Sequence, residues 1–359
     1  MTAVNKTRLK KILNELAGRG LEQMVITDPA AIFYLTGSRI DSGERLLALY
    51  IKISGCFLMI NRLFPAPADP DIHVVPYDDT QDAAKILAGL TDNTRALGVD
   101  RNMCSWVLLR LMELGAASGY VNASVCADAV RQCKDEEEAG RMRRASHLND
   151  RAMEEAARAL RAGISETELA EETARIFRRL GADGISFEPI VAFGANAAEG
   201  HHVPDGTVLR PGDCAILDIG CIKDGYCSDM TRTFFLGEVS DRLREIYALV
   251  KRANEAARSV IRPGVPMSRI DEEARRIIRA AGYGEYFNHR LGHFIGIEVH
   301  EAGDVSAANN TPAASGMTFS IEPGIYLPGI GGVRIEDLVL VTETGCETLN
   351  AFSREITVL

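Results

Sequence analysis

Two apolar stretches in the second half of the chain carry acidic residues where a buried strand normally has aliphatic ones. The first, residues 215–220, reads AILDIG and contains Asp218. An ionised carboxylate in an apolar core costs many kcal/mol unless it is paired or bound to a metal. Any fold of this chain must therefore bring a counter-charge to these acids.

The first stretch leads into an Asp224-Gly225 pair and returns with Asp229. An Asp-Gly pair favours the two central positions of a tight hairpin turn. Such a turn places Asp218 opposite Thr231, which shares a strand face with Asp229 because side chains alternate along a strand. We therefore expect the two acids to converge.

A second hairpin repeats this arrangement. Residues 318–324 (TFSIEPG) carry Glu322 and residues 333–339 (VRIEDLV) carry Glu336, with a glycine-rich turn between them. Centring that turn near Gly329 sets Glu322 and Glu336 across from each other. The chain is thus expected to gather four carboxylates, and the repeat hints at an ancient duplication.

Four carboxylates that face one another repel and raise one another's pKa. Two divalent ions would cancel all four charges. His293, in the strand-like residues 292–300, adds one nitrogen donor to an oxygen-rich ligand set, which suits Mn²⁺ best, with Co²⁺, Fe²⁺ or Zn²⁺ able to substitute. A lone histidine in an apolar strand is more often a core residue, but the acids around this one favour a metal ligand.

The first 132 residues alternate helical and strand-like patterns, which predicts an α/β layer. The expected helices are residues 7–16, 79–90 and 105–114, and the expected strands are residues 24–27, 46–53, 56–60 and 72–75. We expect residues 1–132 to form a separate domain, because a chain of 359 residues exceeds what one hydrophobic core usually supports.

A second domain, residues 133–359, is expected to begin with a long charged helix at about residues 134–161. The acidic residues 135–138 suit the start of this helix, where the helix dipole favours them, and Gly163 suits a left-handed cap. Ser165 and Glu168 form a capping box for the next helix. After residue 185, strands and glycine turns dominate, with two helices at about residues 241–261 and 268–281.

The composition disfavours several kinds of partner. Forty basic against fifty acidic side chains give a net charge of -10, which attracts neither nucleic acid nor anionic lipid. The N-terminal residues lack the apolar segment of a signal peptide, and no run of about 18 apolar residues could span a membrane. Eight cysteines without a CxxC pair are typical of reduced thiols. We expect a soluble, cytoplasmic protein.

The chain resembles the proline-specific branch of the pita-bread metallopeptidases: Xaa-Pro dipeptidase (prolidase), aminopeptidase P and the related creatinases. The matching stretches are HHVP (201–204), LDIGCIKDGYCSDMTRTF (217–234), HRLGHFIGIEVHE (289–301), MTFSIEPGIY (317–326) and GGVRIEDLVLVT (331–342). The N-terminal half matches mainly through YLTG (34–37). The resemblance implies a creatinase-like α/β domain followed by a pita-bread domain with an antiparallel sheet and flanking helices.

The resemblance also implies a role for each matching side chain. Two metal ions would be held by Asp218, Asp229, His293, Glu322 and Glu336. Asp229 would bridge the two ions. The substrate would be contacted by His201, His289, His300 and Arg334.

The implied reaction is cleavage of the amide bond before proline in a dipeptide or short peptide, by a homodimer. A hydroxide shared by two cations is nucleophilic at neutral pH because metal binding lowers the pKa of water. Glu322 would pass its proton to the leaving imino nitrogen. His201 or His300 would donate to the carbonyl oxygen as it becomes an oxyanion. Arg334 would orient a substrate carboxylate or the acids of the metal site.

Three departures from the family pattern concern the substrate pocket. His202 stands where glycine is frequent, and Phe294 follows the metal histidine where a small residue is common. Ala302-Gly303-Asp304 replaces a more usual acidic-proline step. These departures leave the metal ligands intact but bear on the size of the substrate.

Two other functions stay open at this point. One is hydrolysis of another small amide, such as a modified amino acid or a compatible solute, at the same metal site. The other is a non-catalytic binding protein on the same fold, against which the five intact ligands argue. Methionine aminopeptidase is disfavoured by the full N-terminal domain and by RIED (334–337). The sequence does not separate a dipeptidase from an aminopeptidase.

Overall fold

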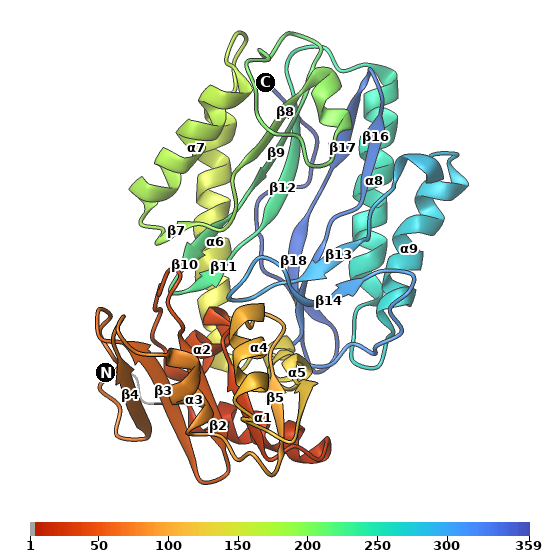
Figure 1. Ribbon diagram of the computed structural model, residues 1–359. Coiled ribbons are helices and arrows are strands. Elements are labelled where there is room, and N and C mark those ends of the chain that lie inside the picture. The colour runs from red at the N-terminus through yellow and green to blue at the C-terminus, as the bar shows by residue number, and fades with distance from the viewer. Residues whose placement is uncertain (1–3) are drawn as a thin grey trace. The chain divides into compact units, whose positions relative to one another are not determined.

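The computed structural model describes residues 4–359 (Figure 1). The chain divides into two compact units, one ending at Arg131 and the other comprising Gln132–Leu359. Within the described residues, every helix is too short or too polar to cross a membrane. All eight cysteines are free thiols.

The first unit is a mixed sheet flanked by helices. Its strands are β1 (Gln23–Ile26), β2 (Ala48–Lys52), β3 (Gly55–Asn61), β4 (Ile72–Tyr77), β5 (Ala96–Val99) and β6 (Gly119–Asn122), in the order β4-β3-β2-β1-β5-β6. Its helices are α1 (Lys6–Gly18), α2 (Pro29–Thr36), α3 (Ala83–Ala88), α4 (Ser105–Glu113) and α5 (Ser124–Gln132). The predicted α/β layer is confirmed.

The second unit contains two main sheets and two pairs of long helices. The helices are α6 (Glu136–Ala159), α7 (Glu166–Leu180), α8 (Asp241–Val260), α9 (Met267–Ala280) and the short 3-10 turns η1 (Gly194–Ala198) and η2 (Gly284–Tyr286). One sheet has the order β20-β12-β9-β8, with β8 (Ile190–Phe193), β9 (Cys214–Ile219), β12 (Met230–Phe235) and β20 (Thr357–Val358).

The other main sheet has the order β14-β13-β15-β18-β19, and two small sheets extend the hairpins, β16-β17 and β11-β10-β7. The bounds of these strands are β7 (Gly184–Ile185), β10 (Cys221–Lys223), β11 (Tyr226–Cys227), β13 (Gly292–Phe294), β14 (Glu301–Val305), β15 (Thr318–Ile321), β16 (Gly324–Leu327), β17 (Gly331–Arg334), β18 (Asp337–Val341) and β19 (Cys346–Thr348). The strand expected at residues 292–300 is therefore much shorter, because the backbone leaves the sheet after Phe294.

A helix pair covers one face of each main sheet. α6 and α7 pack Met153 and Phe177 against Leu217 and Ile219 of β9. Side chains alternate along a strand, so Asp218, between those two apolar residues, points to the opposite face. The apolar core thus directs the acid away from the helices.

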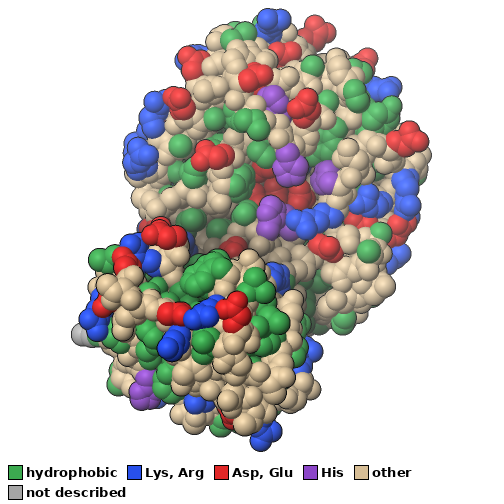
Figure 2. Space-filling view, viewed as in Figure 1, with side chains coloured by type: hydrophobic (Ala, Val, Ile, Leu, Met, Phe, Trp, Pro, Cys, Tyr) green, Lys and Arg blue, Asp and Glu red, His purple; other side chains and the backbone are tan. Residues whose placement is uncertain are grey.

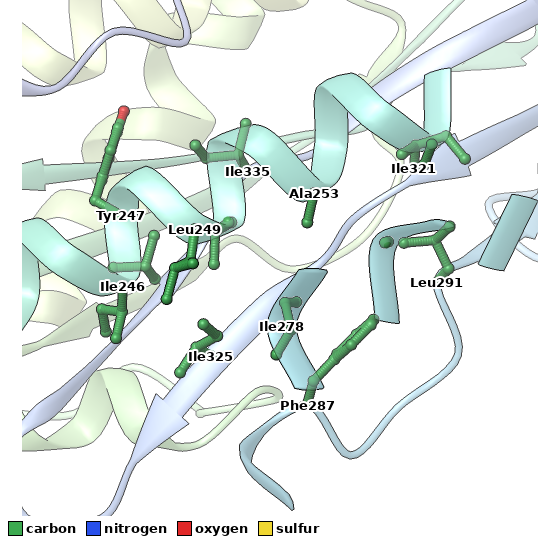
Figure 3. Packing of buried hydrophobic residues seen from close by; sticks show 14 of the residues in the cluster. Ile246, Tyr247, Leu249, Ala253, Ile278, Phe287, Leu291, Ile321, Ile325 and Ile335 are labelled. Atoms are coloured by element: carbon green, nitrogen blue, oxygen red, sulfur yellow. The ribbon is translucent and has the colours of Figure 1, made fainter. Parts of the chain in front are cut away.

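The second helix pair forms the larger core, part of which Figure 3 shows from close by. Ile246 of α8 and Ile278 of α9 are buried in one cluster with Ile321 and Ile325 of the sheet side. Each of these side chains is fully shielded from water, and full burial of an aliphatic side chain stabilises the fold by about 1.5–3 kcal/mol. This core fixes the hairpin that carries Glu322.

The sequence predicts where helices α6 and α7 begin better than it predicts where α6 ends. Asp135 with Glu138, and Ser165 with Glu168, form the two capping boxes that begin α6 and α7. Gly163 has a left-handed φ of 84°. It lies in the turn beyond α6, however, and is not the helix cap that the sequence predicts.

Candidate metal centre

The first acidic hairpin has the predicted register. β10 and β11 are joined by the two-residue turn Asp224-Gly225, whose φ angles are 53° and 80°, as a type I′ turn requires. The same register runs on into β9 and β12, where Asp218 pairs with Thr231. Asp229 lies just before β12, two positions from Thr231 and therefore on its face.

The second acidic hairpin also has the predicted register. β16 and β17 pair around a turn centred on Gly329, and β15 and β18 continue in the same register. Glu322 and Glu336 occupy opposing positions in the break between these two ladders. Pro323 has no N–H to continue the ladder, and Glu336 N–H donates instead to Thr231 O at 3.1 Å. The two hairpins therefore touch at their acids.

His293, on β13, completes the cluster. Its Nε2 lies 3.4 Å from Asp229 Oδ2, 3.7 Å from Glu322 Oε1 and 3.9 Å from Glu336 Oε1. One ligand atom each from Asp229, His293 and Glu336 lie within 4.8 Å of one another. These side chains, with Asp218, line one cavity of about 330 Å³. The structure thus brings together all five residues that the sequence predicts as ligands.

Several carboxylate oxygens of this cluster lack a hydrogen-bond donor. Asp218 Oδ1, Asp229 Oδ1 and Glu336 Oε1 are buried, and no group of residues 4–359 donates to them. The other oxygens of Asp218 and Glu336 have donors, since Arg334 donates to Asp218 Oδ2 at 2.8 Å and Thr231 to Glu336 Oε2 at 2.7 Å. Buried acceptors normally have a partner. Divalent cations fit here, because they bind carboxylate oxygens and one imidazole nitrogen.

The acids also repel one another. Burial, and then the charge of Asp218, raises the pKa of Asp229 well above its ordinary value. Burial, and then the charge of Asp229, does the same for the pKa of Glu336, and burial raises the pKa of Glu322 to about 7. These acids can all be ionised at neutral pH only when cations neutralise them.

Arg334 holds the acids of the metal centre in place through hydrogen bonds. It is buried, and its Nη2 donates to Asp218 Oδ2, its Nε to Thr231 Oγ1 at 3.0 Å and its Nη1 to Tyr326 Oη at 2.9 Å. Nη1 also donates to Gly200 O at 3.1 Å. Every guanidinium nitrogen is therefore occupied. Of the two roles expected for Arg334, these contacts favour orienting the acids.

The three histidines that the sequence predicts as substrate contacts line the same cavity. The His300 ring lies edge-on to the His293 ring, with centroids 4.3 Å apart. His289 Nε2 lies 3.0 Å from Tyr326 Oη, and burial lowers the pKa of His289 to about 4. His289 is thus neutral at neutral pH, and His201 and His300 are the exposed members of the three.

Two of the departures from the family pattern form one packing arrangement. The Phe294 side chain is buried, with its ring centroid 5.4 Å from that of Phe319. A Cβ at Gly303, whose φ is 114°, would come within 2.7 Å of the Phe294 ring. Glycine at 303 therefore makes room for Phe294, and Phe294 is not among the residues that line the cavity.

The third departure, His202, also lines the cavity, but it pairs with Glu166 and not with an acid of the metal centre. It is buried, and its Nε2 lies 2.7 Å from Glu166 Oε2. No local pattern in the sequence pairs these two residues, which lie 36 positions apart. The contacts of Tyr326 with Arg334 and of Thr231 with Glu336 are likewise not predicted by the sequence, although both residues lie in the matching stretches.

Figure 2 shows the surface above this cluster. Acidic side chains form the floor of a hollow, and histidine and basic side chains stand at its rim. The apolar residues that line the hollow, called the apolar wall below, are Phe187, Pro189, Ile190, Val203 and Pro204. The hollow therefore combines an acidic floor with an apolar wall, as small-molecule sites often do.

Known proteins match both units. Residues 140–343 match metallopeptidase family M24, and residues 8–133 match the creatinase/prolidase N-terminal domain. An uncharacterized peptidase of Staphylococcus aureus (strain USA300) is 35% identical over 97% of this chain and 100% of its own length. The structure of a dipeptidase from Pyrococcus horikoshii OT3 has a TM-score of 0.92 at 37% identity, covering 98% of this chain and 100% of its own.

A prolidase from Thermococcus sibiricus has a TM-score of 0.92 at 33% identity, and each chain is covered completely. These likenesses extend over both units and so include the whole acidic cluster and the cavity above it.

Proposed function

Because the chain belongs to metallopeptidase family M24, with a creatinase/prolidase N-terminal domain before its pita-bread domain, we propose that it cleaves the amide bond before proline. The substrates would be dipeptides or short peptides. Support comes from the similarity to a dipeptidase and a prolidase over nearly the whole chain. The family also implies a dinuclear metal site.

The observation that carries this proposal is the group of buried carboxylate oxygens without donors at the floor of the cavity. The residues that would hold two divalent cations are Asp218, Asp229, His293, Glu322 and Glu336. When bound, the cations would supply a nucleophilic water and polarise the scissile carbonyl. The single nitrogen among the ligands favours manganese.

The side chains around this centre have distinct tasks. Glu322, the most exposed acid of the cluster with 16% of its side chain open, would accept a proton and pass it to the leaving imino nitrogen. His300 and His201 would donate to the carbonyl oxygen as negative charge develops there. Arg334 would hold Asp218 in place through its bond of 2.8 Å. The apolar wall would take the proline ring.

Metal analysis combined with a panel of dipeptides tests the proposal. We expect the manganese-loaded protein to bind two ions per chain and to hydrolyse Ala-Pro at least about tenfold faster than Ala-Ala. Bound metal without Xaa-Pro turnover would point to another small amide as substrate. Absence of bound metal would leave a binding protein. Sedimentation of the same sample tests the expected homodimer.

A further inference from the structure

One arginine that lines the cavity has a guanidinium group without a hydrogen-bond or ion-pair partner in the described part of the chain. Arg290 is exposed and lines this cavity. Among residues 4–359, no group accepts a hydrogen bond from its guanidinium and no carboxylate forms an ion pair with it. Arg334, the other arginine close to the acids, is buried and has every nitrogen occupied. Arg290 is therefore the arginine available to a ligand.

Arg290 lies beside the residues of the metal centre. It lines the same cavity as His293 and His300. His289, the preceding residue, lies with Nδ1 2.7 Å from Arg290 O, which ties the backbone here to a cavity histidine. The guanidinium thus stands close to the site of the reaction.

We propose that Arg290 binds the C-terminal carboxylate of the substrate, so that the site acts on dipeptides. This inference rests on the proposed function. An arginine fork matches a carboxylate in shape and charge and donates two parallel hydrogen bonds. A dipeptide has its carboxylate on the residue that follows the scissile bond, whereas a longer peptide has a neutral amide there. A volume of about 330 Å³ is at the lower end of small-molecule sites, which suits two residues.

Dipeptides and their C-terminal amides separate this recognition from catalysis. We would measure kcat and KM for Ala-Pro, Ala-Pro amide, Ala-Ala and Ala-Ala amide with the wild type and Arg290→Gln. For the wild type we expect kcat/KM at least about tenfold higher for each free acid, mainly through KM. In Arg290→Gln the free acids should lose about tenfold to a hundredfold, while the amides stay unchanged.

Three further variants act as controls. Arg262→Gln removes the same charge from an exposed position of the same unit that is not among the cavity-lining residues, and it should behave as the wild type. Glu188→Gln removes a charge of opposite sign from the cavity lining and should keep the preference for the acid. Arg290→Lys keeps the charge but loses the fork, so an intermediate preference is expected.

The outcomes distinguish the two proposals. Equal rates on acid and amide in the wild type, or equal losses on both in Arg290→Gln, would overturn the role of Arg290. Preference for Ala-Ala acid over its amide, lost in Arg290→Gln, would support Arg290 while refuting proline specificity. If no dipeptide is cleaved, calorimetric titration of Ala-Pro and its amide decides, because only wild-type binding of the acid should depend on Arg290.

Discussion

Two clusters in the second unit place a histidine among carboxylates, yet only one has the chemistry of a metal site. Each cluster has three residues, and each residue offers one ligand atom; these three atoms lie within 4.8 Å of one another. The metal cluster contains Asp229, His293 and Glu336, and the loop cluster contains Glu166, His202 and Asp205. Distance alone would assign a cation to both.

Hydrogen bonds separate the two clusters. In the loop cluster, Glu166 Oε1 accepts from Phe193 N at 2.7 Å and from Asn196 Nδ2 at 3.1 Å. Its Oε2 lies 2.7 Å from His202 Nε2 and accepts from Asp205 N at 3.1 Å. The carboxylate is thus fully served by protein donors. The metal cluster instead keeps buried oxygens without a donor.

The difference teaches that the unmet acceptors, and not the proximity of acids and a histidine, indicate where a cation is needed. It also gives the loop cluster another task. Glu166 begins α7 and binds two segments of chain, residues 193–196 and the loop that carries His201. We therefore expect the loop cluster to hold the wall of the cavity in place, without any metal.

The largest expected effect comes from the metal cluster. Asp229→Asn should abolish peptide hydrolysis, a loss of at least about a thousandfold in kcat/KM, and should prevent metal uptake. The fold should persist, because burial already raises the pKa of Asp229 and a neutral amide removes a repelling charge. Turnover of Ala-Pro, elemental analysis and circular dichroism measure the three effects.

Asp205→Asn is the matched control in the loop cluster. Its side chain is exposed, and Glu166 receives the backbone N–H of residue 205 and not the carboxylate. Metal content and turnover should therefore match the wild type. Retained turnover in Asp229→Asn, or loss of metal in Asp205→Asn, would contradict the assignment of the two clusters.

The sequence predicted the metal cluster well because local rules govern it. A two-residue Asp-Gly turn sets the register by counting, and the alternation of side chains then fixes that Asp218 and Asp229 share a face. The same count around Gly329 placed Glu322 opposite Glu336. Local rules pair the acids only within each hairpin, so the meeting of the two hairpins, and of His293 with them, needed the tertiary fold.

The loop cluster could not be predicted from the sequence, because its residues meet only through long-range contacts. His202 and Glu166 lie 36 positions apart, and no turn or periodicity counts across that distance. Helix α2 was also missed, although Asp28 caps its start and Gly37, with a φ of 66°, ends it. Its eight residues are too few to establish a helical period. Long-range pairs and short elements therefore required the structure.

A smaller effect is expected from Glu166→Gln. The substitution removes the negative charge and replaces one carboxylate oxygen, which accepts two hydrogen bonds, with an NH₂ group that can only donate. The N–H groups of His202 and Asp205 then lose their acceptor. Loss of partners for buried polar groups should lower the free energy of unfolding by about 2–4 kcal/mol. Urea denaturation measures this loss. Metal stoichiometry should be unchanged, and KM should rise more than kcat falls, because the His201 loop loses its anchor.

Glu171→Gln, an exposed acid on the same helix, is the control and should unfold at the wild-type urea concentration. The metal content of Glu166→Gln is the decisive reading. Metal loss in that variant at full stability would mean that the loop cluster binds a cation after all, and the distinction between the two clusters would fail.

The smallest effect is a pH dependence of stability that arises from His202. Burial lowers its pKa, but the hydrogen bond and charge of Glu166, with Glu199 and Asp205 nearby, raise it more, so that the folded pKa lies above the ordinary value. A raised folded pKa means that the charged pair stabilises the protein fully below about pH 6.5 and less as pH rises through the folded pKa. The free energy of unfolding should therefore fall as the pH rises from about 6.5 through the folded pKa of His202, and by less than the loss in Glu166→Gln.

His202→Gln should flatten this part of the profile, since glutamine keeps a donor toward Glu166 but does not titrate. Urea denaturation of both proteins across that pH range, at one fixed concentration of manganese, measures the difference. The metal-cluster groups titrate equally in both proteins, so subtracting the two profiles isolates His202. Parallel profiles would show that His202 is neutral in its pair with Glu166, and the loop cluster would then owe its stability to hydrogen bonds alone.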